Sequence, residues 1–338
     1  MPLDAALPRA ASGGGLPLAW RTPLARLALA WAALVGLAWA DWAEMARQWW
    51  DASTYNHILL VPPILAWLVR LRWPELGRLT PTGWWPGLGL LGGALIVWLA
   101  GAAAGINLAS QLGAVLMLQA AVATLLGPPR VAAGLLFPLG YMLFLVPFGD
   151  EMVPALQAIT ADLAVALTHA SGVPAVLDGV FIDTPAGLFE VAEACSGVKF
   201  LVAMVALGTL VAHLCFASWR RRAVFMLAAV VVPVLANGVR AWGTIYVAQS
   251  QGIAFAAGFD HIVYGWIFFA LVMAAVLGAA WRFFDRSPED RLVDPEAIER
   301  DALLARLAQL RIGGWHAATA IFVLAAIGAW MDRILRVP

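Results

Sequence analysis

The chain has 338 residues, of which 62% are apolar and only 12% are charged, and its formal net charge is zero. This composition excludes an ordinary soluble domain and is typical of a polytopic membrane protein. Because basic residues are not in excess, we expect no nucleic-acid partner, and two cysteines cannot build a disulfide framework. The predicted fold class is therefore an all-α polytopic membrane protein that lies in a lipid bilayer.

Apolar runs in chain order predict about nine transmembrane helices with a cytoplasmic amino terminus. Residues 1–23 carry Pro, Gly and Arg without periodicity and predict a cytoplasmic leader, and residues 41–56 predict an acidic, Trp-rich connection. Pro62 and Pro63 are expected to interrupt the second span. The predicted spans are residues 24–40, 57–69, 84–103, 107–126, 131–146, 196–216, 224–246, 261–281 and 315–331.

One long stretch, residues 148–194, breaks the apolar pattern and could form structure outside the bilayer. It predicts a surface helix over 153–170 and a short hairpin around Pro185 to Gly187. Most of the 21 basic residues fall in the loops that this map places inside. By the positive-inside rule, the stretch therefore lies on the outer face.

The predicted domain order follows from this map. Residues 24–286 form the main transmembrane domain, and residues 287–314 form a cytoplasmic amphipathic segment whose helix starts at Asp294, Pro295 and Glu296. Residues 315–338 form a last transmembrane helix with a short outer tail.

Three residues from separate spans are predicted at the same outer depth. Cys195 opens the sixth span, Arg240 lies near the outer end of the seventh with Asn237 on the same helix face, and His261 opens the eighth. A thiolate can attack a peptide carbonyl, a histidine can carry the proton to the leaving amine, and a guanidinium can stabilise the oxyanion or the thiolate. The set suits acyl transfer, and either water or an amine could resolve the acyl-enzyme.

Each residue also has a structural interpretation. A lone cysteine is most often a small buried hydrophobe, a terminal arginine commonly reaches for lipid headgroups, and a lone histidine usually satisfies a hydrogen bond. Asp260 and Tyr264 could orient His261 or only cap its helix, and His57 is a rival histidine on the outer face.

A transporter or channel with a polar, outward-facing site is the alternative function. Intramembrane Arg, Asn and Asp residues often mark substrate paths. We see no inverted repeat and few charges in the middle of spans, and no GxSxG or HExxH motif supports another protease class. We expect no cofactor and no metal.

The sequence resembles the exosortase family, closest to the exosortase A type, over residues 24–286. The resemblance is carried by EACSG at 193–197, NGVR at 237–240 and the histidine of GFDHIVYGW at 258–266, with the Tyr55 to His57 region similar to an early polar motif of the family. It implies that Cys195 is the nucleophile, Arg240 the stabilising cation and His261 the acid and base. Supporting or substrate-binding roles are expected for Glu193, Ser196, Gly197, Asn237, Asp260, Tyr264 and His57.

The resemblance also implies a substrate class and a location. The substrates would be exported proteins with a carboxy-terminal PEP-CTERM sorting signal, cut at the outer face of a bacterial inner membrane in systems for protein sorting and exopolysaccharide or biofilm formation. Relatives of the exosortase A type often carry a further exopolysaccharide-associated domain, which we expect here to be absent or a separately encoded partner.

Overall fold

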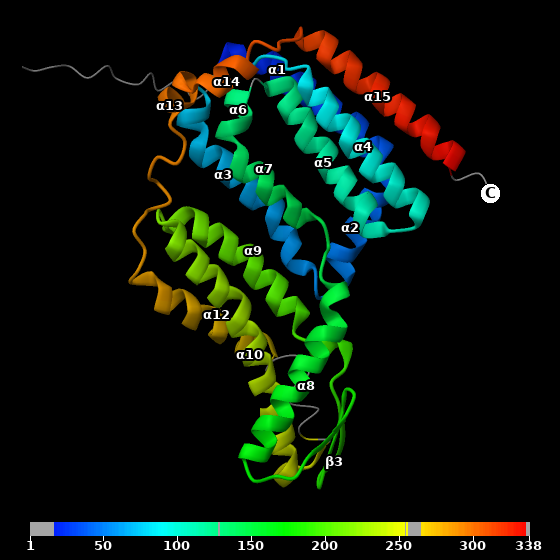
Figure 1. Cartoon of the computed structure of the whole chain (residues 1–338), viewed down its shortest axis with the longest axis vertical. Helices are drawn as coiled ribbons and strands as arrows, with labels where there is room; N and C mark the ends of the chain where they lie inside the picture. Colours follow the sequence, from blue (N-terminus) through cyan, green and yellow to red (C-terminus); the bar gives the residue numbers. More distant parts are fainter. Residues whose placement is uncertain (1–16, 128, 254, 256–264, 336–338) are drawn as a thin grey trace, which may run out of the picture.

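Helices make up nearly all of the secondary structure in the computed structural model, which describes residues 17–127, 129–253, 255 and 265–335 (Figure 1). Two groups of helices lie next to each other. The first group comprises α1 (Leu18–Leu37), α2 (Trp39–Asp51), η1 (Asn56–Leu60), α3 (Val61–Leu76), α4 (Pro86–Ala104), α5 (Asn107–Leu126), α6 (Pro129–Gly134), α7 (Leu136–Tyr141), η2 (Met142–Leu145) and α15 (Gly314–Leu335).

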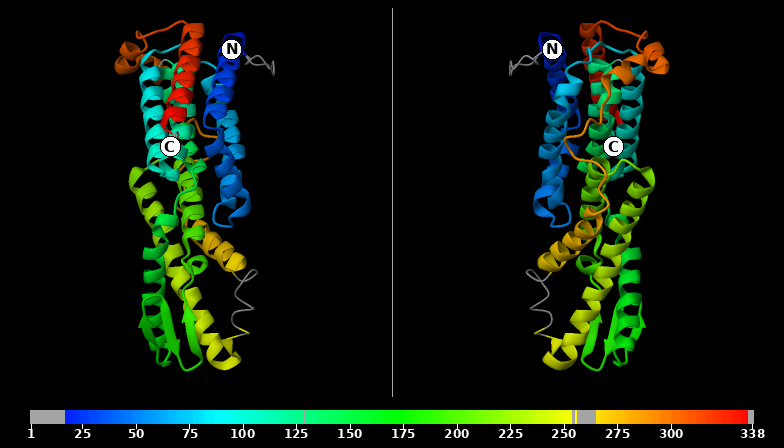
Figure 2. Two further views of the ribbon diagram at one scale, coloured as in Figure 1. Left: turned by 90° about the vertical axis from the view of Figure 1, so that its right-hand side faces the viewer. Right: turned by 90° about the vertical axis from the view of Figure 1, so that its left-hand side faces the viewer.

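The second group surrounds α10, which packs against α8, α9 and α12. It comprises η3 (Asp150–Met152), α8 (Val153–Ala170), β1 (Val176–Asp178), β2 (Phe181–Thr184), β3 (Gly187–Glu190), η4 (Glu193–Cys195), α9 (Val198–Cys215), α10 (Trp219–Gln251) and α12 (Gly265–Trp281). Two short helices, α13 (Pro295–Arg300) and α14 (Ala302–Leu307), connect α12 to α15. Figure 2 shows the strands and the end of α10 at the opposite end of the molecule from α13 and α14.

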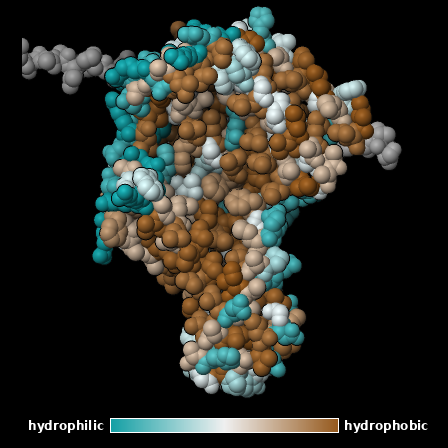
Figure 3. All heavy atoms as spheres, in the orientation of Figure 1, coloured by the Kyte–Doolittle hydropathy of each residue, from teal (hydrophilic) through white to brown (hydrophobic). Residues whose placement is uncertain are grey.

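Six helices among the described residues are long and apolar enough to cross a membrane, or seven if the pair α1 and α2, bent by 86°, counts as one span. The six are α4, α5, α8, α9, α10 and α15. Figure 3 shows apolar surface over both groups, with hydrophilic residues gathered around α13, α14 and the strands. The all-α polytopic fold is confirmed, while the count of nine spans and the cytoplasmic amino terminus stay predictions.

Helices extend into two predicted segments of the first hundred residues. α1 begins at Leu18, inside the range predicted as the leader, and most of the predicted connection, up to Asp51, belongs to the helix α2. α2 is stable there because its polar residues find partners in the bundle. The Asp41 carboxylate accepts hydrogen bonds from Trp98 Nε1 at 2.8 Å and from Ser110 Oγ at 2.6 Å.

Proline positions explain where two other spans differ from the prediction. Pro62 and Pro63 do not interrupt the second span but start α3, where a missing N–H removes no helical hydrogen bond. The fifth span is not continuous. Pro138 has no N–H to donate to the carbonyl of Gly134, and the chain breaks there into α6 and α7.

The carboxy-terminal part contains the predicted helix start but not one long amphipathic helix. Asp294 caps α13 by accepting hydrogen bonds from the N–H groups of Glu296 and Ala297, and a second cap at Asp301 starts the separate helix α14. α15 then packs against α1 and α4. The last helix is thus part of the first group.

The expected hairpin around Pro185 to Gly187 is formed by β2 and β3, and a helix, α8, forms over the expected range 153–170. Because α8 is also long and apolar enough to cross a membrane, its place outside the bilayer stays a prediction. β1 adds a third antiparallel strand that the sequence analysis missed, giving the order β1-β2-β3. β1 has only three residues and joins β2 through Gly179, whose φ of +62° suits a tight turn. A strand of three residues is too short to show an alternation of apolar and polar side chains in the sequence.

Close glycine packing holds α4 against α5. A Cβ on Gly113 would lie 2.5 Å from the backbone nitrogen of Trp98, and a Cβ on Gly101 would collide with the backbone of Ser110. Gly105 instead ends α4 in the left-handed conformation, with φ of +68°. Lipid offers no hydrophobic drive between helices, so such close contacts stabilise the pair.

We expect Gly113→Ala to destabilise the protein by roughly 1–3 kcal/mol, because the added methyl overpacks the α4–α5 contact. Thermal unfolding in detergent should show a lower melting temperature. Gly93→Ala in α4 is the matched control, since nothing lies within 4 Å of a Cβ there. Equal melting temperatures for the two variants would contradict this account of the packing.

Candidate functional site

Cys195 lies at the end of the turn η4, just before α9, and is half-buried. The turn is closed by its own backbone, because Cys195 N–H donates to the Ala192 carbonyl at 2.8 Å and Ser196 N–H donates to the Glu193 carbonyl at 3.1 Å. The other cysteine, Cys215, ends the same helix. The two thiols therefore lie near opposite ends of α9.

Ser196 and Gly197 shape the step from η4 into α9. Ser196 is 2% exposed, and its Oγ accepts from the N–H of Val198 at 3.4 Å. Gly197 has φ of +85°, which suits glycine, and a Cβ there would lie 2.8 Å from Cγ of Asn237. Both residues therefore support the position of Cys195 through the backbone.

Asn237 joins this loop to two helices. From α10, its Nδ2 donates to the carbonyl of Cys195 at 2.8 Å and to Thr160 Oγ1 on α8 at 3.0 Å. The side chain is 3% exposed. The next residue, Gly238, lets the helices approach, since a Cβ there would lie 2.7 Å from Cβ of Leu163. The Asn-Gly pair of NGVR thus docks α10 on α8 and on the Cys195 loop.

Arg240 follows Asn237 by three residues, so it faces the same side of α10, and it is 9% exposed. Lys199, in the first turn of α9, is attracted by Cys195 and repelled by Arg240. The structure therefore brings the predicted thiol and guanidinium into one cluster. It adds a second cation, Lys199, which the sequence analysis left aside although it stands only four residues after Cys195.

Three predicted site residues, Asp260, His261 and Tyr264, lie outside the described residues. α10 ends at Gln251 and α12 begins at Gly265, so the segment that carries His261 connects the helix of Arg240 to its neighbour. Its role stays a prediction.

His57 and Tyr55 occupy the turn between α2 and α3. His57 Nδ1 lies 3.1 Å from the Thr54 carbonyl, and burial lowers the pKa of the imidazole. Burial raises the pKa of the Tyr55 phenol, and the nearby Asp150 carboxylate raises it further. Asp150 follows Gly149, which packs against the first turns of α9. The Tyr55 region thus borders α9, the helix that follows Cys195. Glu193, the predicted site residue at the start of η4, has an exposed side chain.

Among the residues that the structure describes, no group of three or more His, Cys, Asp or Glu side chains is placed to hold a metal ion. The chemistry-bearing cluster at the start of α9 consists of one thiol and two cations. Such a cluster favours a thiolate and can stabilise a developing oxyanion.

We expect Asn237→Ala to lower stability by roughly 1–3 kcal/mol, because it leaves the carbonyl of Cys195 without its buried donor. It should also change the rate at which a maleimide alkylates Cys195 in a Cys215→Ala background. Gln249→Ala is the control, since Gln249 on the same helix donates to Thr184 Oγ1 and not to the Cys195 loop. An unchanged alkylation rate in Asn237→Ala would contradict the positioning role.

Comparison with known families gives one match, described as transmembrane exosortase (Exosortase_EpsH), over residues 49–278. No curated protein and no solved structure matches the chain. The family match covers more than half of the chain, from the end of α2 into α12, and includes Cys195, Asn237 and Arg240. The chain therefore belongs to the transmembrane exosortase family, a family of membrane-embedded, protein-sorting cysteine transpeptidases.

Proposed function

We propose that this protein cleaves carboxy-terminal, PEP-CTERM-type sorting signals from exported proteins at the outer face of a bacterial inner membrane, with Cys195 as the nucleophile. The observation that carries the proposal is the hydrogen bond from Asn237 to the carbonyl of Cys195. It fixes the nucleophile's loop on the helix of Arg240, with Lys199 interacting electrostatically with both. The link to exopolysaccharide or biofilm systems rests on the family resemblance.

The proposed reaction proceeds through a thioester. The thiolate of Cys195 attacks the scissile carbonyl carbon, a C–S bond forms, and Arg240 and Lys199 stabilise the oxyanion. The C–N bond then breaks, and His261 gives its proton to the leaving amine. Water resolves the thioester to a carboxylic acid, or an amine resolves it to a new amide, and either step restores the thiol.

The orientation of the site also belongs to the proposal. Basic residues cluster in the loop between α9 and α10 and in the segment after α12, so these ends are assigned to the cytoplasm. Cys195 lies at the other end of α9, which assigns it to the outer, periplasmic face. A substrate helix in the same membrane would present its outer end at this depth.

The central test compares Cys195→Ala with Cys215→Ala in cells that co-express a PEP-CTERM substrate. Cys195→Ala should abolish processing and Cys215→Ala should leave it nearly unchanged, because we assign the nucleophile to Cys195 alone. Mass spectrometry of the mature carboxy terminus detects cleavage and shows whether water or an amine resolved the thioester. Normal processing in Cys195→Ala would reject the enzyme and favour the alternative, a transporter or channel with a polar outer-facing site.

A charge-conserving pair of substitutions tests the two cations. Arg240→Lys should reduce processing strongly, by about 10²-fold or more, because lysine lacks the planar fork of donors that a tetrahedral intermediate requires. Lys199→Arg, the matched exchange, should keep most of the activity, since we propose that Lys199 stabilises the oxyanion only through its positive charge. Initial rates of substrate processing, measured for both variants and the wild type, test these two expectations. Near-normal turnover in Arg240→Lys would mean that Arg240 serves only as a charge.

β3 is an edge strand that leads toward Cys195 and could bind an extended substrate motif as an added strand. In a two-residue hairpin the flanking residues Thr184 and Gly187 are a hydrogen-bonded pair, so the N–H of Leu188 faces the outer edge. Leu188→Pro should therefore slow processing without changing membrane insertion. Leu177→Pro removes the equivalent outward N–H on β1, and equal rates in the two variants would contradict binding at β3.

A further inference from the structure

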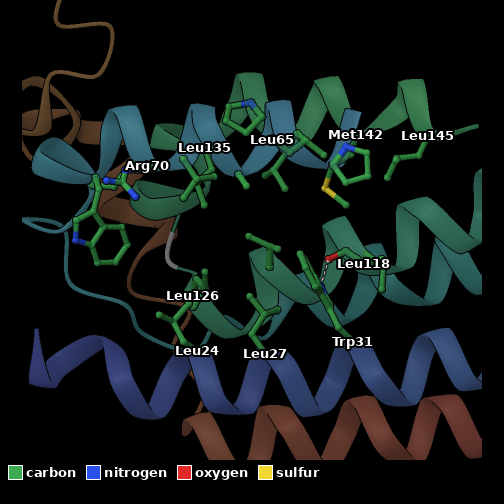
Figure 4. Close-up of a pocket in the computed structure, with 18 of the residues that line it drawn as sticks. Leu24, Leu27, Trp31, Leu65, Arg70, Leu118, Leu126, Leu135, Met142 and Leu145 are labelled. Carbon is green, nitrogen blue, oxygen red and sulfur yellow. Dashed lines mark hydrogen bonds between the residues drawn. The ribbon is translucent and has the colours of Figure 1, made fainter. Parts of the chain in front are cut away.

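A large apolar cavity lies inside the first group of helices, away from Cys195. Its volume is about 1170 Å³, above the roughly 300–1,000 Å³ of typical small-molecule sites. It is bounded by α1, α2, α3, α5 and α7, and Figure 4 shows leucine side chains from several of these helices pointing into it. Five tryptophans contribute to its wall: Trp20, Trp31, Trp42, Trp49 and Trp73.

The cavity is long rather than round. Its lining runs along α3 from Pro62 to Leu76, which corresponds to roughly 21 Å at the helical rise of 1.5 Å per residue. One leaflet of the hydrocarbon core is roughly 15 Å deep. A space of this length and apolarity suits flexible aliphatic chains, because water would find few hydrogen-bond partners in it.

The two ends of the cavity differ. Figure 4 places Arg70 at one end and Leu145 at the other. At the Leu145 end, Trp49 Nε1 donates to the carbonyl of Leu145 at 3.0 Å and ties α2 to η2 across the cavity. A transmembrane helix that continued past this end would have to pass around or break the link between Trp49 and Leu145. A lipid tail can enter at the Arg70 end and stop before that link.

At the opposite end, Arg70 is exposed and has no ion-pair partner among the described residues. Its neighbour Arg72 is buried and donates to the carbonyls of Pro288 and Asp290, so it is not available to a ligand. Trp73 follows Arg70 by three residues and lines the same cavity. One free guanidinium beside indole rings fits an anionic head group with a phosphate.

We propose that this cavity binds an anionic phospholipid, with its acyl chains between α1, α3 and α5 and its phosphate on Arg70. Under the positive-inside assignment, Arg70 faces the cytoplasmic leaflet, where anionic lipids gather and basic pockets between helices bind their head groups. The site goes beyond the proposed peptidase function and shares with it only the assigned orientation in the membrane.

The test quantifies lipids that remain bound after purification in mild detergent, by mass spectrometry, from membranes containing both phosphatidylglycerol and phosphatidylethanolamine. The wild type should retain phosphatidylglycerol. Arg70→Gln should lower its retention about fivefold, the effect of one basic residue at an anionic surface. Arg78→Gln, an exposed arginine outside the cavity lining, is the matched control and should retain it.

A second variant fills the space. Ala66 lines the cavity, and Ala66→Trp should expel the lipid and remove the rise in melting temperature that phosphatidylglycerol micelles give the delipidated wild type. A photoactivatable residue at position 66 should label lipid. Labelling of a polypeptide instead, or equal phosphatidylglycerol retention in Arg70→Gln and Arg78→Gln, would overturn the proposal.

Discussion

One side-chain amide, that of Asn237, determines how the candidate site is assembled. Its amide nitrogen donates to Thr160 on α8 and to the carbonyl of Cys195, and its own backbone belongs to α10. A single buried group therefore links three segments. A buried amide that loses such partners is costly, which makes the arrangement specific. Gly197 and Gly238 leave the space that the approach requires. The position of Cys195 relative to Arg240 follows from these contacts.

The surroundings of the site are held by further polar links rather than by apolar packing alone. Gln157 on α8 donates to the Val191 carbonyl, Trp242 on α10 donates to Ser171 Oγ, and Gln249 donates to Thr184 Oγ1. These bonds tie the sheet and α8 to α10. The first group combines glycine contacts, as between α4 and α5, with polar links of its own, such as those of Asp41. Around the site, side-chain hydrogen bonds thus add to the close helix packing that both groups share.

The site near α9 and the cavity in the first group carry two different kinds of chemistry. The cluster at the start of α9 collects a thiol and two cations, which suits acyl transfer. The cavity in the first group is apolar over most of its length and carries one free cation among its described lining residues. The two regions meet near Gly149, which packs against α9 directly after the turn that leaves η2. A lipid in the cavity would therefore support the helices that border the site.

Composition and apolar runs alone determined the membrane class, and the span 107–126 coincides with α5 because no proline or charge interrupts it. The order of EACSG, NGVR and the later histidine motif determined the candidate residues and the family. Only the tertiary structure decided that residues 39–51 are helical, since α2 depends on Trp98 and Ser110, which are distant in sequence. The break in the fifth span has a local cause in Pro138. The tertiary structure alone brought Lys199 on α9 within electrostatic reach of Arg240 on α10, because the sequence does not set the distance between charges on separate helices.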